Sequence, residues 1–268
     1  MINKQQFIKK SKNAFTLAEV LITLGIIGVV AALTIPMLIT SIQKHSIASA
    51  LREAQSILNQ AVKMYAAETD EEGSLDFDVS LTEQEFAEKY FVPYLKVARI
   101  CTSMEDGCWE TGDFYGYYDL AGVKMKDKTP YSIVLNNGMI LGFNKVASGS
   151  SYALISILVD LDGKGKRNTL GRDVQSFFLF NNSGMVKGTT SYMNNGIYPG
   201  GFGCNGIPHV QYTREELLGT NVTRGCNKNM GSSSGGCSNY GGTRPGAGAG
   251  CAAVIFKDGW QIRSDYPW

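Results

Sequence analysis

A single carboxylate lies inside a long apolar run near the beginning of this chain. Between Phe15 and Ile42, the only formally charged side chain is that of Glu19. This run of 28 residues is longer than the roughly 20 that an α-helix needs to cross the core of a bilayer. A carboxylate in hydrocarbon costs at least about 2–3 kcal/mol, so an ionisable group in such a segment points to a function. The run therefore predicts a membrane-spanning helix with a functional Glu19.

The residues before the run, 1–14, form a basic leader without any acidic residue. Positive flanks stay on the cytoplasmic side of a membrane, so the rest of the chain is expected on the other side. The run is too long for the core of a secretory signal peptide, which has about 7–15 residues, and no small-x-small cleavage pattern follows it. Hydropathy alone therefore predicts a simple signal anchor. The leader's charges come from Lys4, Lys9, Lys10 and Lys12.

The join between leader and apolar run has a specific pattern. Residues 14–21 read AFTLAEVL, with a small residue, an aromatic residue and then Glu19 one helical turn later. Pro36 lies 21 residues after Phe15, where a proline is expected to kink the helix. These residues resemble the type IV pilin and type II secretion pseudopilin family, whose motif is a basic leader, a small residue, and Phe-Thr-Leu-x-Glu-x-Leu. The resemblance covers residues 9 to about 45.

The resemblance implies that a prepilin peptidase cuts between Ala14 and Phe15 and that the new amino group of Phe15 is N-methylated. Alanine stands here where the family usually has glycine. Removing 14 of the 268 residues leaves a mature chain of 254. The Phe15 ammonium and the Glu19 carboxylate would lie at one membrane depth, and pairing them between neighbouring subunits lowers the cost of burying both. The other interpretation of Glu19 is a residue that snorkels to the membrane surface.

Beyond the run, the sequence predicts more helix. Apolar residues recur every three or four positions, which predicts one helix from about Phe15 to about Ala67, bent near Pro36, whose second half packs on a head domain. A capping-box pattern at Thr82 and Glu85 predicts a short helix over residues 81–95 that Pro93 ends. The residues expected to be buried are Ile47, Leu51, Ala54, Leu58, Ala61 and Tyr65 in the long helix and Phe86, Tyr90 and Phe91 in the short one.

The pattern changes to strands from about residue 114. Asn137-Gly138 and Asp258-Gly259 each lie between two short apolar runs, which predicts two hairpins: 131–135 with 139–143, and 254–256 with 260–262. Residues 151–159 and 174–180 read as buried strands. A long N-terminal helix followed by an antiparallel sheet is an α+β arrangement, and it is also the fold that the resemblance implies. The expected parts are a leader (1–14), a transmembrane or filament-core helix (15–42) and a globular, pilin-like head (43–268).

Six cysteines follow the apolar run, and an even number on the translocated side of a membrane predicts disulfides. Cys101 and Cys108 are close enough in sequence to tie a local loop. The other four flank a glycine-rich stretch, for which we expect the pairs Cys204–Cys226 and Cys237–Cys251, although four cysteines allow three pairings. Zinc is the competing interpretation, but no Cys-x-x-Cys is present. The stretch 231–250 is either a surface loop or an exposed recognition loop.

Residues 160–163 read DLDG directly after a predicted strand, and Asp173 follows soon after. Alternating carboxylates with a glycine can surround calcium with oxygen ligands, here Asp160, Asp162 and Asp173. The spacing does not fit a full EF-hand loop, and residues 164–167 bring three positive charges. A tight turn held by aspartate side chains is the favoured interpretation, with calcium as the alternative. No other cofactor is predicted.

Nothing in the sequence predicts catalysis. His45 and His209 have no recognisable nucleophile or metal partner, and no phosphate or dinucleotide motif is present. The net charge of +1 and the scattered basic residues predict no nucleic-acid surface.

The predicted function is that of a structural subunit of a type II secretion pseudopilus or type IV pilus. Such a protein waits in the bacterial inner membrane with its N-terminus in the cytoplasm and its head outside, and then enters a helical filament. The implied partners are prepilin peptidase, other pilin-like subunits, the inner-membrane assembly platform and the membrane itself. The alternatives are a minor tip pilin that binds a ligand in adhesion or DNA uptake, and an anchored ectodomain that never assembles.

Overall fold

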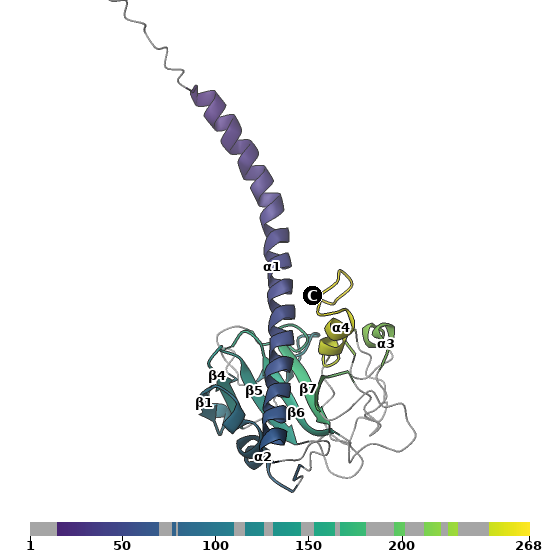
Figure 1. Cartoon of the computed structure of the whole chain (residues 1–268). Coiled ribbons are helices and arrows are strands. Elements are labelled where there is room, and N and C mark those ends of the chain that lie inside the picture. Colours follow the sequence, from purple (N-terminus) through teal and green to yellow (C-terminus); the bar gives the residue numbers. More distant parts are fainter. Residues whose placement is uncertain are drawn as a thin grey trace, which may run out of the picture. The chain divides into compact units, whose positions relative to one another are not determined.

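The computed structural model describes residues 15–69, 77–78, 80–109, 116–125, 131–145, 153–163, 167–180, 196–201, 212–220, 225–229 and 247–268. The chain divides into two compact units, Met1–Gln43 and Lys44–Trp268. The expected leader, with Ala14, lies outside the described residues. The elements are labelled in Figure 1.

A single helix, α1 (Leu17–Glu68), spans 52 residues and belongs to both units. It includes Pro36, which has no N–H to donate to the carbonyl one turn earlier. In the part of α1 that belongs to the first unit, threonine hydroxyls donate to backbone carbonyl oxygens of the preceding turn. Thr40 Oγ1, for example, donates to Pro36 O at 3.0 Å. The long helix predicted from periodicity is confirmed, within two residues at either end.

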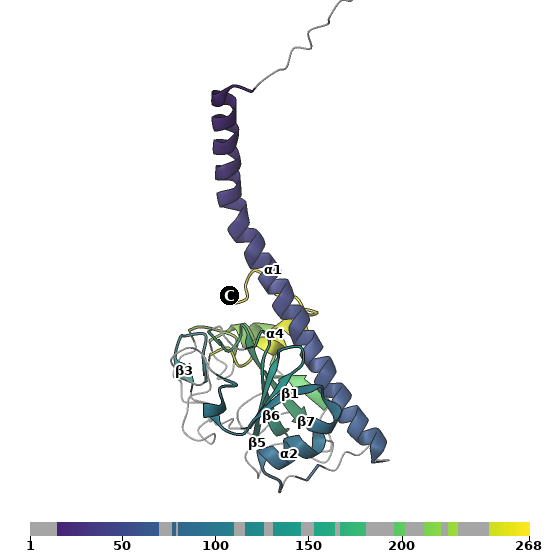
Figure 2. The same ribbon diagram turned by 90° about the vertical axis from the view of Figure 1, so that its left-hand side faces the viewer.

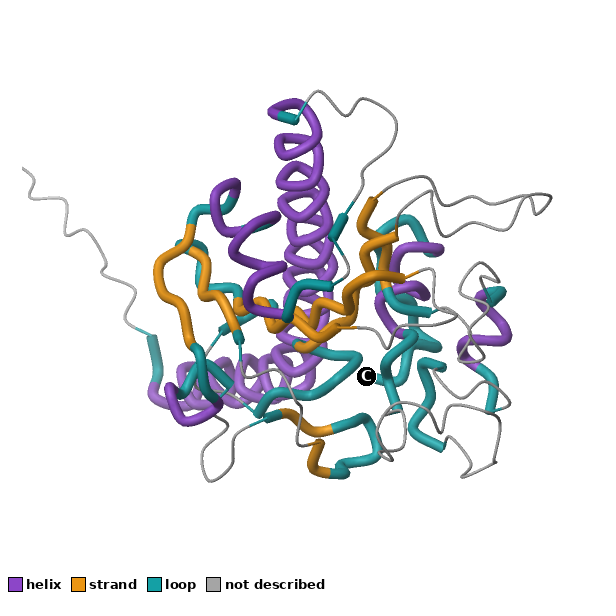
Figure 3. The backbone as a smooth tube through the Cα atoms, turned by 90° about the horizontal axis from the view of Figure 1, so that it is seen from below, coloured by secondary structure: helices purple, strands orange, loops and turns teal. Residues whose placement is uncertain are grey.

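The second unit is built on a six-stranded antiparallel sheet in the order β1-β4-β5-β6-β7-β8. From β4 to β8, each strand pairs with the next along the chain. A two-stranded ribbon, β2-β3, lies on the other side of the sheet from α1 (Figures 2 and 3). The bounds are β1 Val97–Cys101, β2 Tyr117–Tyr118, β3 Lys124–Met125, β4 Ser132–Leu135, β5 Ile140–Lys145, β6 Ala153–Asp160, β7 Val174–Phe180 and β8 Gly196–Pro199.

The sheet has a packed core on each face, because side chains alternate along a strand. On β6, Ile157 and Val159 belong to the core that α1 covers, whereas Leu158 belongs to the core shared with Trp109 and Tyr117. Strands buried on both faces read as continuous apolar runs, which is why β6 and β7 were found from the sequence.

The second half of α1 lies across one face of the sheet (Figure 1). Its buried residues repeat with helical spacing and join one core with the sheet, and only Ile47 of the predicted set is partly exposed. Burying a leucine fully stabilises a fold by about 1.5–3 kcal/mol, so this stripe is a major part of the head's stability. The buried residues of α1 are Ala48, Leu51, Ala54, Leu58, Ala61, Val62 and Tyr65.

The predicted short helix is present as α2 (Glu83–Tyr90), followed by the 3₁₀ turn η1 (Val92–Tyr94) that contains Pro93. Its capping box is complete: Glu85 N donates to Thr82 Oγ1 at 3.3 Å, and Thr82 N donates to Glu85 Oε2 at 2.9 Å. Phe86, Tyr90 and Phe91 are buried as expected, and Tyr90 contacts Tyr65 of α1 with ring centroids 4.8 Å apart.

The Asn137-Gly138 hairpin is confirmed, but the predicted hairpin at Asp258-Gly259 is wrong. Gly138 takes a φ of 90° in the turn between β4 and β5. Around the second pair, the chain instead forms the helix α4 (Cys251–Lys257), and Gly259 ends it with a φ of 69°. An Asp-Gly pair after an apolar run suits a helix end as well as a hairpin, and the preceding Ala252 and Ala253 favour helix.

Other elements were not predicted, among them β1, the β2–β3 ribbon, β8 and the one-turn helix α3 (Arg214–Leu218). α3 is tied to the C-terminal segment by Arg214, whose guanidinium contacts Asp258 at 2.6 Å and Asp265 at 2.8 Å. Hydrogen bonds and the charges of these two carboxylates raise the pKa of Arg214. Arg263 also reaches Asp258, at 3.1 Å.

The edge strand β8 is held by a side chain of α1. The Asn59 amide pairs with both backbone groups of Ile197: Ile197 N donates to Oδ1 at 3.0 Å, and Nδ2 donates to Ile197 O at 3.1 Å. Gln55 Nε2 donates to the same carbonyl at 3.2 Å. Asn59 therefore takes the place of a neighbouring strand at this position.

Replacing Asn59 with leucine should lower the free energy of unfolding by about 1–3 kcal/mol, because the N–H of Ile197 loses its partner in a partly buried site. Guanidinium denaturation of the full chain in detergent micelles would measure this. Gln60→Leu, at the exposed neighbouring position, is the control and should change stability by less than about 0.5 kcal/mol. Equal losses in the two variants would contradict the role given to Asn59.

Candidate functional site

Glu19 lies in the first turn of α1 and forms a capping box with Thr16. Thr16 N and Thr16 Oγ1 each donate to Glu19 Oε2 at 2.8 Å, and Glu19 N donates to Thr16 Oγ1 at 3.3 Å. These bonds satisfy donors at the start of the helix that have no partner inside it. The sequence signal was the T-x-x-E spacing, the same as at Thr82 and Glu85, but it was not recognised here beside the apolar run.

The capping box uses only one oxygen of the Glu19 carboxylate. Within residues 15–69, Oε1 makes no hydrogen bond, and the side chain is exposed. The carboxylate is therefore fixed in direction by Thr16 and still has an oxygen open to a donor from another molecule. A preorganised anion of this kind suits a partner that carries a positive charge.

Residues 15–42 offer an apolar surface on all sides of the helix. Phe15 is 86% exposed. The helix α1 is long and apolar enough to cross a membrane, and its most apolar stretch of 18 residues contains no buried residue. A helix that is apolar all round needs lipid or other helices around it. Its exposed large side chains are Phe15, Leu17, Val20, Leu21, Ile22, Leu24, Ile26, Ile27, Val29, Val30, Leu33, Ile35, Met37, Leu38, Ile39 and Ile42.

Residues 9–35 match a family described as the prokaryotic N-terminal methylation motif. The chain carries the N-terminal methylation motif. It is the signature of type IV pilins and pseudopilins, and the match includes the end of the leader, Phe15 and Glu19. The motif together with the apolar helix fits a protein that crosses the inner membrane once. A search of curated proteins and a search of solved structures found no match.

The structure places the motif's residues as follows. Phe15 directly precedes the cap residue Thr16, Glu19 is in the first helical turn, and Pro36 is inside the helix. Ala14 lies outside the described residues. Cleavage after Ala14, methylation of Phe15 and the assembly role of Glu19 stay predictions.

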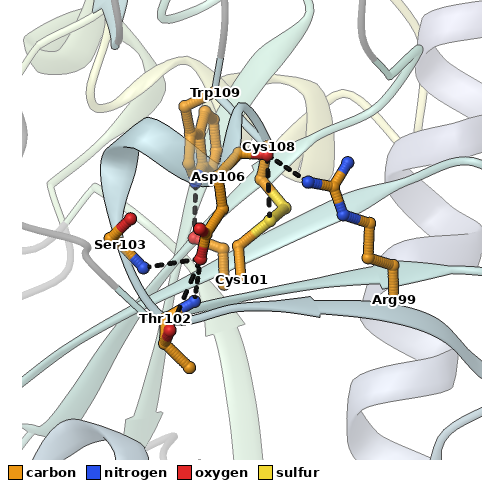
Figure 4. Close-up of a disulfide and its surroundings, with 8 residues drawn as sticks. Arg99, Cys101, Thr102, Ser103, Asp106, Cys108 and Trp109 are labelled. Atoms are coloured by element: carbon orange, nitrogen blue, oxygen red, sulfur yellow. Dashed lines mark hydrogen bonds between the residues drawn. A yellow bond between two sulfur atoms is a disulfide. The ribbon is translucent and has the colours of Figure 1, made fainter.

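One disulfide joins Cys101, at the end of β1, to Cys108 (Figure 4). Between them, the turn η2 (Met104–Asp106) is held by Asp106, whose Oδ2 accepts from the backbone N–H groups of Thr102 at 2.7 Å and Ser103 at 2.9 Å. These backbone bonds, Ser103 first, lower the pKa of Asp106. Arg99 donates to the Asp106 carbonyl, and the buried Trp109 donates to Ser132 Oγ at 2.6 Å. The disulfide and these hydrogen bonds together hold the loop between Cys101 and Cys108 in place on one face of the sheet.

A second disulfide joins Cys226 to Cys251, so the expected pairs Cys204–Cys226 and Cys237–Cys251 are wrong. Backbone bonds bring the two segments together: Gly248 N and Gly250 N both donate to Gly225 O, at 3.2 and 3.3 Å. Sequence proximity favoured other pairs, whereas tertiary contacts decided this one. Cys204, Cys237 and residues 231–246 lie outside the described part of the chain.

The four cysteines that form these disulfides are not available as zinc ligands. Among the described residues, no group of three or more histidine, cysteine, aspartate or glutamate side chains could hold a metal. The predicted trio Asp160, Asp162 and Asp173 therefore does not meet as a purely carboxylate site. Asp162 is exposed, and Asp160 Oδ1 accepts from Asp162 N at 3.2 Å and from Gly163 N at 3.0 Å. The aspartate-held turn favoured from the sequence is present.

Two of these carboxyl groups have unusual environments. Burial, followed by the charges of Asp162 and Asp173, raises the pKa of Asp160 to about 7. Burial also raises the pKa of Asp173 to about 6, against hydrogen bonds from the backbone that lower it. Perturbed carboxyl groups that lie together are a common mark of a functional site, although structural networks produce them too.

The two disulfides should contribute unequally to stability. Loop closure predicts a loss of about 3.5 kcal/mol when Cys226 and Cys251 are both replaced with alanine, since their step is 25 residues. The same change at Cys101 and Cys108, with a step of seven, should cost about 2.4 kcal/mol. Guanidinium denaturation of the two double variants would compare them. A larger loss for the shorter loop would show that loop closure does not govern their effect.

Proposed function

We propose that this chain is a structural subunit of a type II secretion pseudopilus or type IV pilus. Residues 15–42 hold it in the bacterial inner membrane, with the leader in the cytoplasm and the head outside. Prepilin peptidase cuts after Ala14, and the amino group of Phe15 is methylated. The inner-membrane assembly platform then moves the subunit into a helical filament. Its role is mechanical and not catalytic.

The observation that carries this proposal is the apolar surface of residues 15–42 together with Glu19. That surface needs lipid before assembly, and neighbouring helices can replace the lipid afterwards, since both are apolar. Apolar contacts alone would not select one register between two such helices. A single charged pair does, because every other alignment leaves a carboxylate without a partner in an apolar environment.

The partner of Glu19 in this mechanism is the ammonium group that cleavage creates at Phe15 of a neighbouring subunit. Before cleavage, the Phe15 nitrogen is part of a peptide bond and carries no charge. Processing therefore supplies the positive half of the contact, while the capping box already holds the negative half in place. Uncut precursors lack the pair and stay out of the filament.

The amino terminus of the native protein tests the processing step. Mass spectrometry of the protein from its own host should find a chain that begins at Phe15 with an N-methyl group. The reason is that residues 9–35 match the motif that prepilin peptidase recognises. An intact Met1 terminus, with no methylated Phe15, would sink the filament proposal and favour an anchored ectodomain.

The capping box allows the charge of Glu19 to be tested separately from its structural role. Glu19→Gln keeps an acceptor for Thr16, because glutamine also serves at this position of a capping box, but it removes the charge. We expect normal membrane insertion and at least a tenfold loss from the sheared filament fraction, measured by immunoblot.

Thr16→Val is the matched control, since it removes the hydroxyl bond of the cap and leaves the Glu19 charge. We expect this variant to assemble, with at most about 1 kcal/mol lost at the helix start. If Glu19→Gln assembles like the wild type, Glu19 acts only as a helix cap and the charge-pairing mechanism is wrong.

A further inference from the structure

The apolar run places Lys44 at a defined depth in the membrane proposed above. As a helix, residues 15–42 rise by roughly 42 Å, at about 1.5 Å for each residue. A bilayer with its headgroups is about 40–45 Å thick. The run therefore ends in the outer headgroup layer, and Lys44 follows two residues after Ile42 on the same continuous helix. A part of the head that contacts Lys44 lies at this layer, and this placement rests on the proposed membrane location.

A tryptophan of the head contacts Lys44. The Lys44 Nζ atom lies 5.8 Å from the centroid of the Trp268 ring, a distance at which the face of an indole attracts a cation. Lys228 Nζ donates to Trp268 O at 3.1 Å. Trp268 packs against the main core but is only partly buried. Figures 1 and 2 both show the aromatic segment (residues 260–268), coloured yellow, beside α1.

Other contacts hold the aromatic segment in place, so Trp268 is presented from a fixed backbone. Tyr266 is buried, and its hydroxyl donates to Gly171 O. Arg214 Nη2 donates to Asp265 Oδ1 at 2.8 Å, and Trp268 N donates to Tyr266 O at 2.7 Å. A side chain that is already positioned loses little conformational freedom when it binds a partner, which favours a contact at Trp268.

Two lysines give the surface around Trp268 a positive charge. Lys44 and Lys228 both contact this residue, and within the described part of the chain neither of them forms an ion pair. The arginines and aspartates around the aromatic segment pair with one another and leave no net charge: they are Arg214, Arg263, Asp258 and Asp265. A partly buried indole beside two lysines suits a partner that has both an apolar part and a negative charge.

We propose that Trp268, Lys44 and Lys228 form a binding surface for the headgroups of anionic phospholipids, in the outer leaflet of the membrane that residues 15–42 cross. Tryptophan and lysine suit this position, because an indole prefers the headgroup layer and the long lysine stem lets the ammonium reach a phosphate. Lipid is also the partner that every membrane-bound copy meets at this depth. A second copy of the chain reaches the same surface only during assembly.

The contact gives the membrane-bound chain a preferred side. A helix that is apolar all round fixes the depth of the chain, whereas its tilt is set by packing and by anchors such as tryptophan and lysine. Because Trp268 lies on the Lys44 side of α1, the contact draws that side of the head toward the headgroups. The contact breaks when the subunit leaves the membrane, so it belongs to the membrane-bound state and not to the filament.

Fluorescence quenching by brominated lipids tests the contact on the full chain in vesicles. All three tryptophans belong to the head, and Trp109 is 2% exposed, so its emission is a constant background. In vesicles with about 30% phosphatidylglycerol, bromines near the headgroups should quench the emission more than bromines near the bilayer centre. Trp268→Phe, which keeps an aromatic ring against the core, should remove about half of this quenching or more.

Lys44→Gln tests the charge. A lysine near an anionic surface strengthens the attraction about fivefold, so this variant should show about twofold weaker quenching of Trp268 in the anionic vesicles. In vesicles of phosphatidylcholine alone, the variant and the wild type should be quenched equally. Lys63→Gln is the matched control, because Lys63 is exposed on the same helix but lies roughly five turns farther along it; it should behave like the wild type in both lipids.

Flotation of the vesicles separates this contact from the membrane location on which it rests. A chain that does not float with the vesicles contradicts the membrane location and therefore the contact as well. A chain that floats, but is quenched equally as wild type and as Trp268→Phe, overturns the contact alone. If the Trp268 emission escapes the bromines and depends on the ratio of protein to lipid, the partner is a second copy of the chain, which also overturns the lipid contact.

Discussion

The packing of α1 on the sheet is the contact on which the head depends. Leu51, Leu58 and Tyr65 lie in the same core as Ile133, Phe143 and Phe177 of the sheet. Removing the helix would expose this face of the sheet to water, at a cost of about 25 cal/mol for each Å². The helix also supplies Asn59 to the edge strand β8 and Tyr65 to the aromatic contacts of α2. A chain whose first helix failed to form would therefore lack both its membrane segment and its head.

The same helix contains two kinds of surface that obey different rules. In the second unit, an apolar stripe faces the sheet, and polar residues such as Gln55 and Asn59 reach specific backbone groups. Between Phe15 and Ile42, apolar side chains surround the helix on all sides, and Glu19 is the only charged residue. The change from one pattern to the other lies near the boundary between the units at Gln43. One continuous helix can serve both environments because its hydrogen bonds are internal.

Elements that are determined by a few neighbouring residues were predicted correctly from the sequence. The period of α1, the Thr82 capping box and the Asn137-Gly138 turn each need only a few neighbouring residues, and all three are present. The strand β8 was missed because its four residues begin with glycine and end with proline, and its partners come from β7 and α1. The pairing of Cys226 with Cys251 likewise depends on backbone bonds between distant segments.

The same difference between local and long-range signals applies to the site residues. Glu19 was found from its place in an apolar run, but its bonds to Thr16 were missed, although the spacing of a capping box was in the sequence. Asp160 and Asp173 were found as acidic residues near a glycine. The contact between Lys44 and Trp268 could not be predicted, because it joins distant parts of the chain through the fold of the head.

Because of the disulfide between Cys226 and Cys251, the fold of the head depends little on the chain between these two residues. The disulfide and the carbonyl of Gly225 hold the two ends of that stretch together, so a longer stretch is expected to leave α3 and α4 in place. Doubling a closed loop costs only about 0.6 kcal/mol, which the rest of the fold can absorb. Insertions and substitutions between the two cysteines are therefore expected to leave the helix and the sheet unchanged.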